Sequence, residues 1–362
     1  MRENGTLKID EGQERLLERL CNASAVSGDE TEVRAIVLES VKPFVDEVAV
    51  DVMGNVLVKR FGDGKNLMKV MLAAHMDEVG MMVTHDEGKG KFRFDVVGGI
   101  PSHILPAKSV WVGRNKIPGI IGAAPIHLTT KVERRKPISM EDLRLDVGPD
   151  NGKEVKIGDR VVFSTEFTTQ ENAIFAKALD DRIGVTILIQ LLKNAPVNID
   201  LLAAFTVQEE VGLRGAITAA FELDPDIAIA IDCTPANDQP AWDEGDDRWS
   251  ENTQYNTRLG KGPAVYVADR GTISDPRLVR HFVNASQEND IPFQFRQPGG
   301  GRTDAAAIHK QRSGTPSISI SVPARYVHTP LSVCDRLDWE NTQKLINFGL
   351  VSIPGDILAV EI

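Results

Sequence analysis

The chain has 362 residues, 42% of them hydrophobic and 26% charged, so it is long enough for one large domain carrying a smaller one, each with its own core. Its formal net charge is -11, which argues against nucleic acid or an anionic membrane as the main partner. The three cysteines, Cys21, Cys233 and Cys334, are too few and too far apart to predict a disulfide framework or a thiolate metal site.

Two features of the sequence indicate the compartment. The first residues lack the apolar stretch of a signal peptide, and no apolar run elsewhere approaches the ~20 residues that a membrane-spanning helix needs. Cysteine usage fits a reducing environment. We therefore expect a cytoplasmic protein without a membrane partner.

The N-terminal part is predicted to be helical. Apolar residues recur at helical spacing between positions 16 and 21, and again between 33 and 41. Ser27 and Glu30 have the spacing of a capping box in front of the second helix. The apolar run 69–74 is too short for a helix and predicts a buried strand that ends at His75.

The middle of the chain has a different pattern of apolar residues. Short alternating or β-branched runs at 92–97, 109–112 and 160–163, separated by Gly and Pro, predict a small all-β domain. After Ala173 the chain returns to a βα rhythm, with a helix over 183–192 and strands at 201–206, 227–231 and 317–322. The sequence thus predicts an α/β domain made of residues 1–79 and 173–362, with a β domain of residues 80–172 inserted into it.

Several residues capable of binding metal lie at or soon after the predicted strands, where open α/β sheets place their ligands. They are His75 after strand 69–74, Glu209 and Glu210 after strand 201–206, Asp232 after strand 227–231 and His328 beyond strand 317–322, with Asp180 and Asp181 just before the helix at 183. Each alone is weak, because single histidines and paired acids near strands are commonly structural. Together they supply imidazoles and carboxylates, the ligands of zinc, cobalt or manganese.

The charges of these side chains favour two metal ions over one. Two neutral histidines with three carboxylates offset three of the four positive charges on a pair of divalent cations, and a bridging hydroxide would offset the last. Five protein ligands can serve two metals if one carboxylate is shared. We therefore predict a dinuclear centre that keeps open positions for water and substrate.

Four segments carry a resemblance to a known family: residues 74–80 (AHMDEVG), 178–182 (ALDDR), 207–216 (VQEEVGLRGA) and 326–330 (YVHTP). They resemble the M42 family of metallo-aminopeptidases, and the similarity spans nearly the whole chain. Residues 299–305 (GGGRTDA) resemble a further family stretch, in which the family more usually has Gly where this chain has Arg302. The resemblance implies an α/β metallopeptidase fold, a mixed sheet with helices on both faces and an inserted β domain that serves dimerisation.

The resemblance also assigns roles to residues. It implies that His75 and Asp232 hold one metal, that Glu210 and His328 hold the other, and that Asp180 bridges the two. Glu209 would be the general base that takes a proton from water and returns it to the leaving amine. Asp77 would orient the His75 ring. The peptide bond between Asp180 and Asp181 would be cis.

By the same resemblance, the activity is removal of the N-terminal residue from short peptides by a homo-oligomer, either dimers or a hollow dodecamer built from them. One alternative is a deacylase or carboxypeptidase acting on N-acyl amino acids, which would need a cationic anchor for the substrate carboxylate. A metal-free glycosidase would leave His75 and His328 without a role. An assembly protein that keeps the metals only for stability would have lost Glu209, which is present.

Two features bear on substrate preference and point in opposite directions. Arg302 near the cleft would narrow a pocket or attract an acidic side chain, or else points to solvent. The acidic run at 243–251 would favour a basic N-terminal residue if it lines the cleft, or else is a solvated loop. The sequence does not decide between them.

Overall fold

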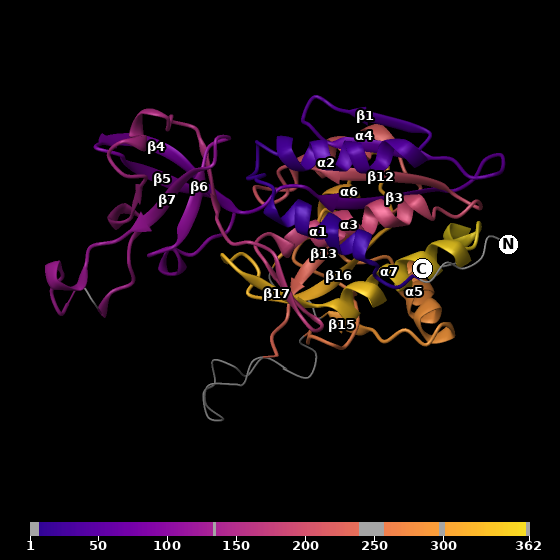
Figure 1. The fold of residues 1–362 in the computed structure, drawn as a ribbon. Helices are drawn as coiled ribbons and strands as arrows, with labels where there is room; N and C mark the ends of the chain where they lie inside the picture. The colour runs from indigo at the N-terminus through magenta and orange to yellow at the C-terminus, as the bar shows by residue number, and fades with distance from the viewer. Residues whose placement is uncertain (1–6, 133–134, 239–256, 297–300, 360–362) are drawn as a thin grey trace.

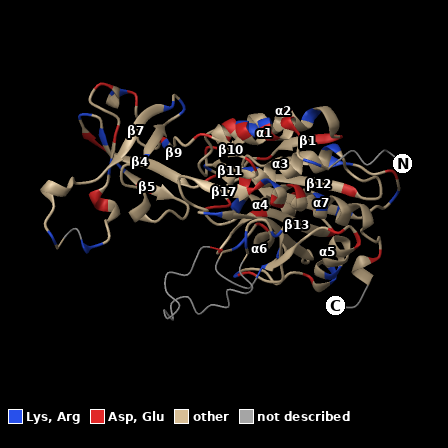
Figure 2. Cartoon of the chain, turned by 60° about the horizontal axis from the view of Figure 1, so that its bottom comes forward, with Lys and Arg blue, Asp and Glu red and all other residues tan. Residues whose placement is uncertain are grey.

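The computed structural model describes residues 7–132, 135–238, 257–296 and 301–359. Figure 1 shows two units, a barrel of strands set apart from a larger α/β unit that contains both ends of the described chain. Within the described residues, no helix is long and apolar enough to cross a membrane. The ribbon in Figure 2 is coloured by residue type, and the positions of acidic and basic residues are interspersed over both units.

The larger unit is built on an 11-stranded mixed sheet. Its strands, in spatial order, are β1 (Glu47–Val50), β2 (Val56–Arg60), β12 (Asp200–Thr206), β3 (Lys69–His75), β13 (Ile227–Pro235), β16 (Ser317–Arg325), β17 (Ser332–Asp335), β11 (Ala173–Ala176) and β10 (Thr168–Gln170), with β14 (Ala264–Tyr266) and β15 (Gln294–Arg296) branching from β16. The four central strands, β12, β3, β13 and β16, are parallel to one another. Their carboxyl ends therefore meet at one edge of the sheet.

Helices cover both faces of this sheet, as the alternation along β3 shows. Val70 and Leu72 of β3 belong to the core cluster formed with the helices of one face, whereas Met71 and Ala73 belong to the cluster of the other face. The first face carries α1 (Glu11–Asn22), α2 (Thr31–Val41), α3 (Leu179–Lys193), α5 (Pro276–Glu288) and α7 (Arg336–Ser352), and the second carries α4 (Arg214–Leu223) and α6 (Ala305–Ile308). The predicted mixed α/β fold is confirmed.

The second unit is a closed barrel of six strands with a core of its own. In spatial order they are β4 (Gly80–Gly88), β5 (Lys91–Val97), β8 (Arg144–Asp146), β7 (Ile117–Gly122), β6 (Ser109–Val112) and β9 (Arg160–Phe163). Burial alternates along β5, where Phe92 and Phe94 point inward. β10 and β11, which follow the barrel, pair within the large sheet.

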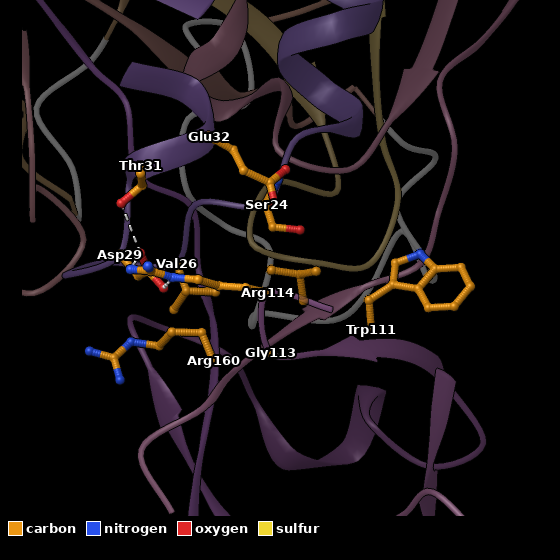
Figure 3. Close-up of a pocket in the computed structure, with 10 residues that line it drawn as sticks. Ser24, Val26, Asp29, Thr31, Glu32, Trp111, Gly113, Arg114 and Arg160 are labelled. Carbon is orange, nitrogen blue, oxygen red and sulfur yellow. Dashed lines mark hydrogen bonds and ion pairs between the residues drawn. The ribbon is translucent and has the colours of Figure 1, made fainter. Parts of the chain in front are cut away.

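Polar contacts join the barrel to the larger unit around a pocket of about 280 Å³. Arg114 of the barrel donates from Nη2 to Asp29 Oδ1 at 3.0 Å, and Lys116 pairs with Glu32 at 3.0 Å. Figure 3 shows Trp111 and Arg114 of the barrel around this pocket with Ser24, Thr31 and Glu32 of the larger unit. The barrel is thus fixed to the segment that leads into α2.

One local prediction is wrong. Ser27 and Glu30 do not form a capping box, because α2 begins at Thr31 and has no side-chain cap. The Ser27 hydroxyl instead donates to Asp77 Oδ2 at 2.6 Å, and Glu30 accepts from the backbone N–H of Gly28 at 2.6 Å. Both side chains therefore lie before the helix and bond to partners other than its first N–H groups.

Candidate metal centre

The residues predicted to bind metal gather at the carboxyl edge of the four parallel strands. His75 is the last residue of β3, and Glu209 and Glu210 follow β12. Asp232 lies within β13, which continues to Pro235 and is longer than predicted. His328 follows β16 after a short turn. Parallel strand order therefore brings together residues that are far apart in the sequence.

Asp180 lies between the two imidazoles, in the first turn of α3. Its Oδ1 is 3.1 Å from His75 Nε2, and its Oδ2 is 3.4 Å from His328 Nε2. On the His75 side, Asp232 Oδ1 is 3.9 Å from Nε2, and on the His328 side Glu210 Oε2 is 3.2 Å from Nε2. Two groups of candidate ligands thus share one carboxylate. We call the five residues of this site the acidic wall: His75, Asp180, Glu210, Asp232 and His328.

Asp77 holds the backbone behind this wall. Its Oδ1 accepts the N–H of Glu209 at 3.0 Å and its Oδ2 accepts the N–H of Glu210 at 3.2 Å. Nδ1 of His75 lies 3.1 Å from the Asp77 carbonyl oxygen and 3.6 Å from its carboxylate. The Asp77 carboxylate, which is fully buried, therefore ties the segment after β3 to the segment after β12.

Several residues around the site have backbone conformations that residues other than glycine rarely adopt. Ala178, Gln208, Leu213, Tyr326 and His328 have φ between 54° and 61°, in the left-handed region. Each lies at or beside a ligand segment, and none is a glycine. Such residues persist where surrounding contacts fix them, and they concentrate at functional sites. The Asp180–Asp181 peptide bond is cis, as the resemblance implies.

Burial and crowding of like charges raise the pKa of several carboxyls at this edge. Burial and then the charge of Asp180 raise the pKa of Glu210 to about 8. Burial raises the pKa of Asp232 well above its ordinary value, with further contributions from the charges of Asp180 and Asp181. Buried carboxylates held this close together need cations to remain ionised. The donor set, imidazoles with carboxylates, fits divalent metal ions.

Other groups at the edge are less suited to be ligands. Asp181 and Cys233 lie close enough to the cluster to form alternative donor sets. However, Asp181 already accepts the N–H groups of His75 at 3.2 Å and Gly184 at 3.1 Å. Burial raises the pKa of the Cys233 thiol well above its ordinary value, so that the thiolate form that binds metal is disfavoured.

A buried ion cluster behind the acidic wall was not predicted from the sequence. Glu78 accepts from Lys177 Nζ at 2.8 Å and from Arg182 Nη2 at 3.0 Å, and all three side chains are at most 3% exposed. Lys177 also donates to the Ala23 carbonyl at 2.8 Å. The only signal in the sequence is the presence of charged residues in apolar surroundings. The cluster joins the segment that follows His75 to the start of α3.

A cleft of about 420 Å³ opens in front of the acidic wall. Its lining includes Glu209, which is 9% exposed, and Arg302, whose side chain is exposed and faces the cleft. Arg270 and Arg296, which the sequence did not single out, also line it. The acidic run at 243–251 lies outside the described residues.

Comparison with known proteins identifies the family. The family description "M42 glutamyl aminopeptidase" matches residues 54–345. The chain belongs to the M42 family of aminopeptidases. It is 32% identical to the lysyl aminopeptidase of Pyrococcus furiosus over 91% of this chain and 94% of that protein. M42 members are thus similar to this chain over nearly its whole length, which confirms the resemblance.

Solved structures agree with this assignment. An aminopeptidase from the archaeon Desulfurococcus kamchatkensis superposes with a TM-score of 0.88 at 34% identity, covering 96% of both chains. The TET1 peptidase of Pyrococcus horikoshii, described as assembling into a tetrahedron or a large octahedral shell, has a TM-score of 0.80 at 31% identity over 94% of this chain and 100% of that one. This M42 chain is therefore a peptide-bond hydrolase of the exopeptidase class.

Proposed function

We propose that this M42 aminopeptidase uses two divalent metal ions, zinc, cobalt or manganese, to release N-terminal residues from short peptides. The observation that carries the proposal is the position of Asp180, whose two carboxylate oxygens face different imidazoles at 3.1 and 3.4 Å. In this proposal, His75 and Asp232 would hold one ion, Glu210 and His328 would hold the other, and Asp180 would be shared by the two sites. When bound, such ions supply Lewis acid chemistry that polarises the scissile carbonyl and acidifies water.

Glu209 is the general base in this proposal. Its carboxylate takes a proton from water as the water oxygen attacks the peptide carbonyl carbon, and passes that proton to the amine nitrogen as the C–N bond breaks. Burial raises the pKa of Glu209 well above its ordinary value, and the charges of Asp304 and Glu210 add to this effect. A raised pKa suits a base that must accept and then return a proton near neutral pH.

The remaining residues position these groups. Asp77 accepts the N–H of Glu209 and of Glu210, so that the base and a ligand are set by one carboxylate. The insertion of residues 80–172, which includes the barrel, is proposed to mediate dimerisation, with larger shells assembled from dimers. Its support is the assembly described for the Pyrococcus horikoshii relative.

The test is hydrolysis of unblocked and N-acetylated dipeptide amides by chelator-stripped protein refilled with zinc or cobalt. We expect metal to restore cleavage of unblocked substrates only, with metal content approaching two ions per chain. Glu209→Gln is expected to keep its metal and to lose about 10²–10⁴-fold in kcat. Cleavage of acetylated substrates would instead establish a deacylase, and activity that survives the chelator would argue for metal-free chemistry.

A further inference from the structure

The wall of the cleft that faces the metal centre carries positive charge. Arg270, Arg296 and Arg302 all line the cleft that contains His75, Asp180 and Glu209. No lysine is among the described residues that line it. We call these three arginines the arginine wall. Its charge is opposite to that of the acidic wall.

Arg270 and Arg302 are brought together by their backbones. Arg270 lies in a tight turn in which Asp269 Oδ1 accepts the N–H groups of Gly271 and Thr272, both at 2.7 Å. The Arg270 N–H donates to the Gly301 carbonyl at 3.3 Å, so the turn is joined to the residue before Arg302. The side chains of Arg270 and Arg302 therefore project from backbone segments that lie next to each other.

The stem of Arg302 lies against Gly271. A Cβ at Gly271 would come within 2.9 Å of Arg302 Cδ and 2.7 Å of Ala306 Cβ, closer than real contacts allow. The absence of a side chain at Gly271 thus leaves the room that the Arg302 stem occupies. Although its side chain is exposed, Arg302 is packed along its stem and lines the cleft.

Arg296 is held at the end of β15. Its Nε donates to Thr234 Oγ1 at 3.1 Å, and its guanidinium carbon lies 5.2 Å from the centre of the Tyr266 ring. Tyr266 itself lines the cleft. Stacking on Tyr266 and the hydrogen bond to Thr234 fix the orientation of the planar Arg296 guanidinium.

Among the described residues, no carboxylate neutralises the charge of Arg270 or Arg302. No ion pair joins either of them to a carboxylate within the described part of the chain. A guanidinium binds a carboxylate through two parallel hydrogen bonds and is attracted to it more strongly in a cleft than in bulk water. A positively charged substrate side chain, such as that of lysine, would be repelled by the two guanidinium groups.

We propose that the arginine wall, with Arg302 as its principal contact, binds a carboxylate of the peptide substrate. This inference rests on the proposed aminopeptidase function and adds its substrate class. The carboxylate has two sources in a short peptide, namely the side chain of an N-terminal Asp or Glu and the free C-terminus of a dipeptide. Both offer the same planar anion to the guanidinium groups.

The experiment measures kcat/KM of the metal-loaded protein on matched substrates. Glutamyl amide and glutaminyl amide differ by charge and not by shape, and report the side-chain source. Leucyl-leucine and leucyl-leucine amide report the C-terminal source. Leucyl amide carries neither carboxylate and reports the hydrolytic activity alone.

We expect one of the two pairs to favour the carboxylate by about 10- to 100-fold, and Arg302→Gln to remove most of that preference. Leucyl amide should change by less than about threefold in the same variant, since Arg302 is assigned no role in the chemical step. Arg302→Lys should restore part of the preference, and Arg302→Glu should reverse it in favour of lysyl amide. Arg15→Gln, an exposed arginine of α1, is the matched control.

The outcomes distinguish the arginine-wall proposal from the proposed aminopeptidase function. If glutamyl amide alone shows the effect, the side chain is the source, and if leucyl-leucine alone shows it, the C-terminus is. If leucyl amide is cleaved and neither pair shows a preference, or if Arg302→Gln leaves the preference intact, the arginine-wall proposal is overturned while the aminopeptidase stands. If no unblocked substrate is cleaved with metal bound, the proposed function itself fails.

Discussion

The acidic wall and the arginine wall of the cleft are held in place by different means. The acidic wall lies at the ends of buried parallel strands, and His75, Asp180 and Asp232 are all largely buried. The arginine wall comes from a turn, a short edge strand and the segment before α6, and Arg270 and Arg302 are exposed. Buried groups with several hydrogen bonds keep one geometry, whereas exposed long side chains retain rotamer freedom. The comparison teaches that the residues proposed for the chemistry are held by the core of the fold, whereas those proposed for selectivity lie on exposed loops and an edge strand.

The largest expected effect comes from removing the ion cluster that supports the acidic wall. Glu78→Gln leaves Lys177 and Arg182 buried without their counter-ion, which is expected to lower the free energy of unfolding by about 3–5 kcal/mol. Denaturant unfolding measures this change. As a control, Glu47→Gln disrupts the exposed pair with Lys59 and should cost less than about 1 kcal/mol. Equal effects of the two substitutions would contradict the structural role of the cluster.

The same cluster predicts a dependence on pH. Burial alone would raise the pKa of Glu78, but the charges of Lys177 and Arg182 outweigh burial and hold the pKa below its ordinary value. A lowered folded-state pKa means that Glu78 stabilises the protein above its unfolded pKa of about 4.3, and that this stabilisation is lost as the pH falls through the folded value. The difference in unfolding free energy between wild type and Glu78→Gln should be constant from about pH 6 to 8 and narrow only below about pH 4.

An intermediate effect is expected at Asp77. In Asp77→Asn, one carboxylate oxygen becomes an NH₂ group that faces the N–H of Glu209 or of Glu210, so two donors oppose each other. We expect metal affinity or kcat to fall about 10- to 100-fold, as for other residues that orient metal ligands. Metal titration and kinetics on leucyl amide measure this loss, and the ratio between charged and neutral substrates should stay unchanged. A change in that ratio alone would break the distinction between the two walls.

The smallest effect is expected behind the arginine wall. Gly271→Ala places a methyl group against Arg302 Cδ and Ala306 Cβ, so the arginine stem must move. The preference for a carboxylate substrate should fall by about threefold to tenfold, while metal content stays at the wild-type level. Gly355→Ala, where a Cβ meets no atom within 4 Å, is the control. A fall in metal content with an intact preference would show that the two walls are not independent.

The sequence predicted that the residues of the acidic wall lie together, but it did not predict the arginine wall, and the reason is physical. His75, Glu210 and Asp232 follow apolar runs whose length and composition indicate buried strands, and parallel strands must end at a common edge. Arg270 and Arg296 lie outside such runs, and their positions depend on the turn at Asp269 and on a stacked Tyr266, which no periodicity reports. Arg302 was singled out only as a departure from the family pattern.

Local polar contacts were equally difficult to predict. Ser27 and Glu30 had the spacing of a cap, but the Ser27 hydroxyl bonds to Asp77, fifty residues further along the chain. The cluster of Glu78, Lys177 and Arg182 likewise depends on a long-range contact between β3 and α3. Hydrophobic periodicity identifies elements, whereas the partner of a polar side chain is decided by how those elements meet.

The closed barrel also has a consequence for how the chain folds. Met81 of β4 pairs with Val161 of β9, so the chain enters and leaves the barrel at adjacent positions. An unstructured insertion of this length would add roughly 2–3 kcal/mol of loop-closure entropy compared with a short loop. Because the folded barrel holds its own ends together, the insertion costs the α/β unit little of that loop-closure entropy. The segments that carry His75 and Asp180 are therefore brought together as though a short turn connected them.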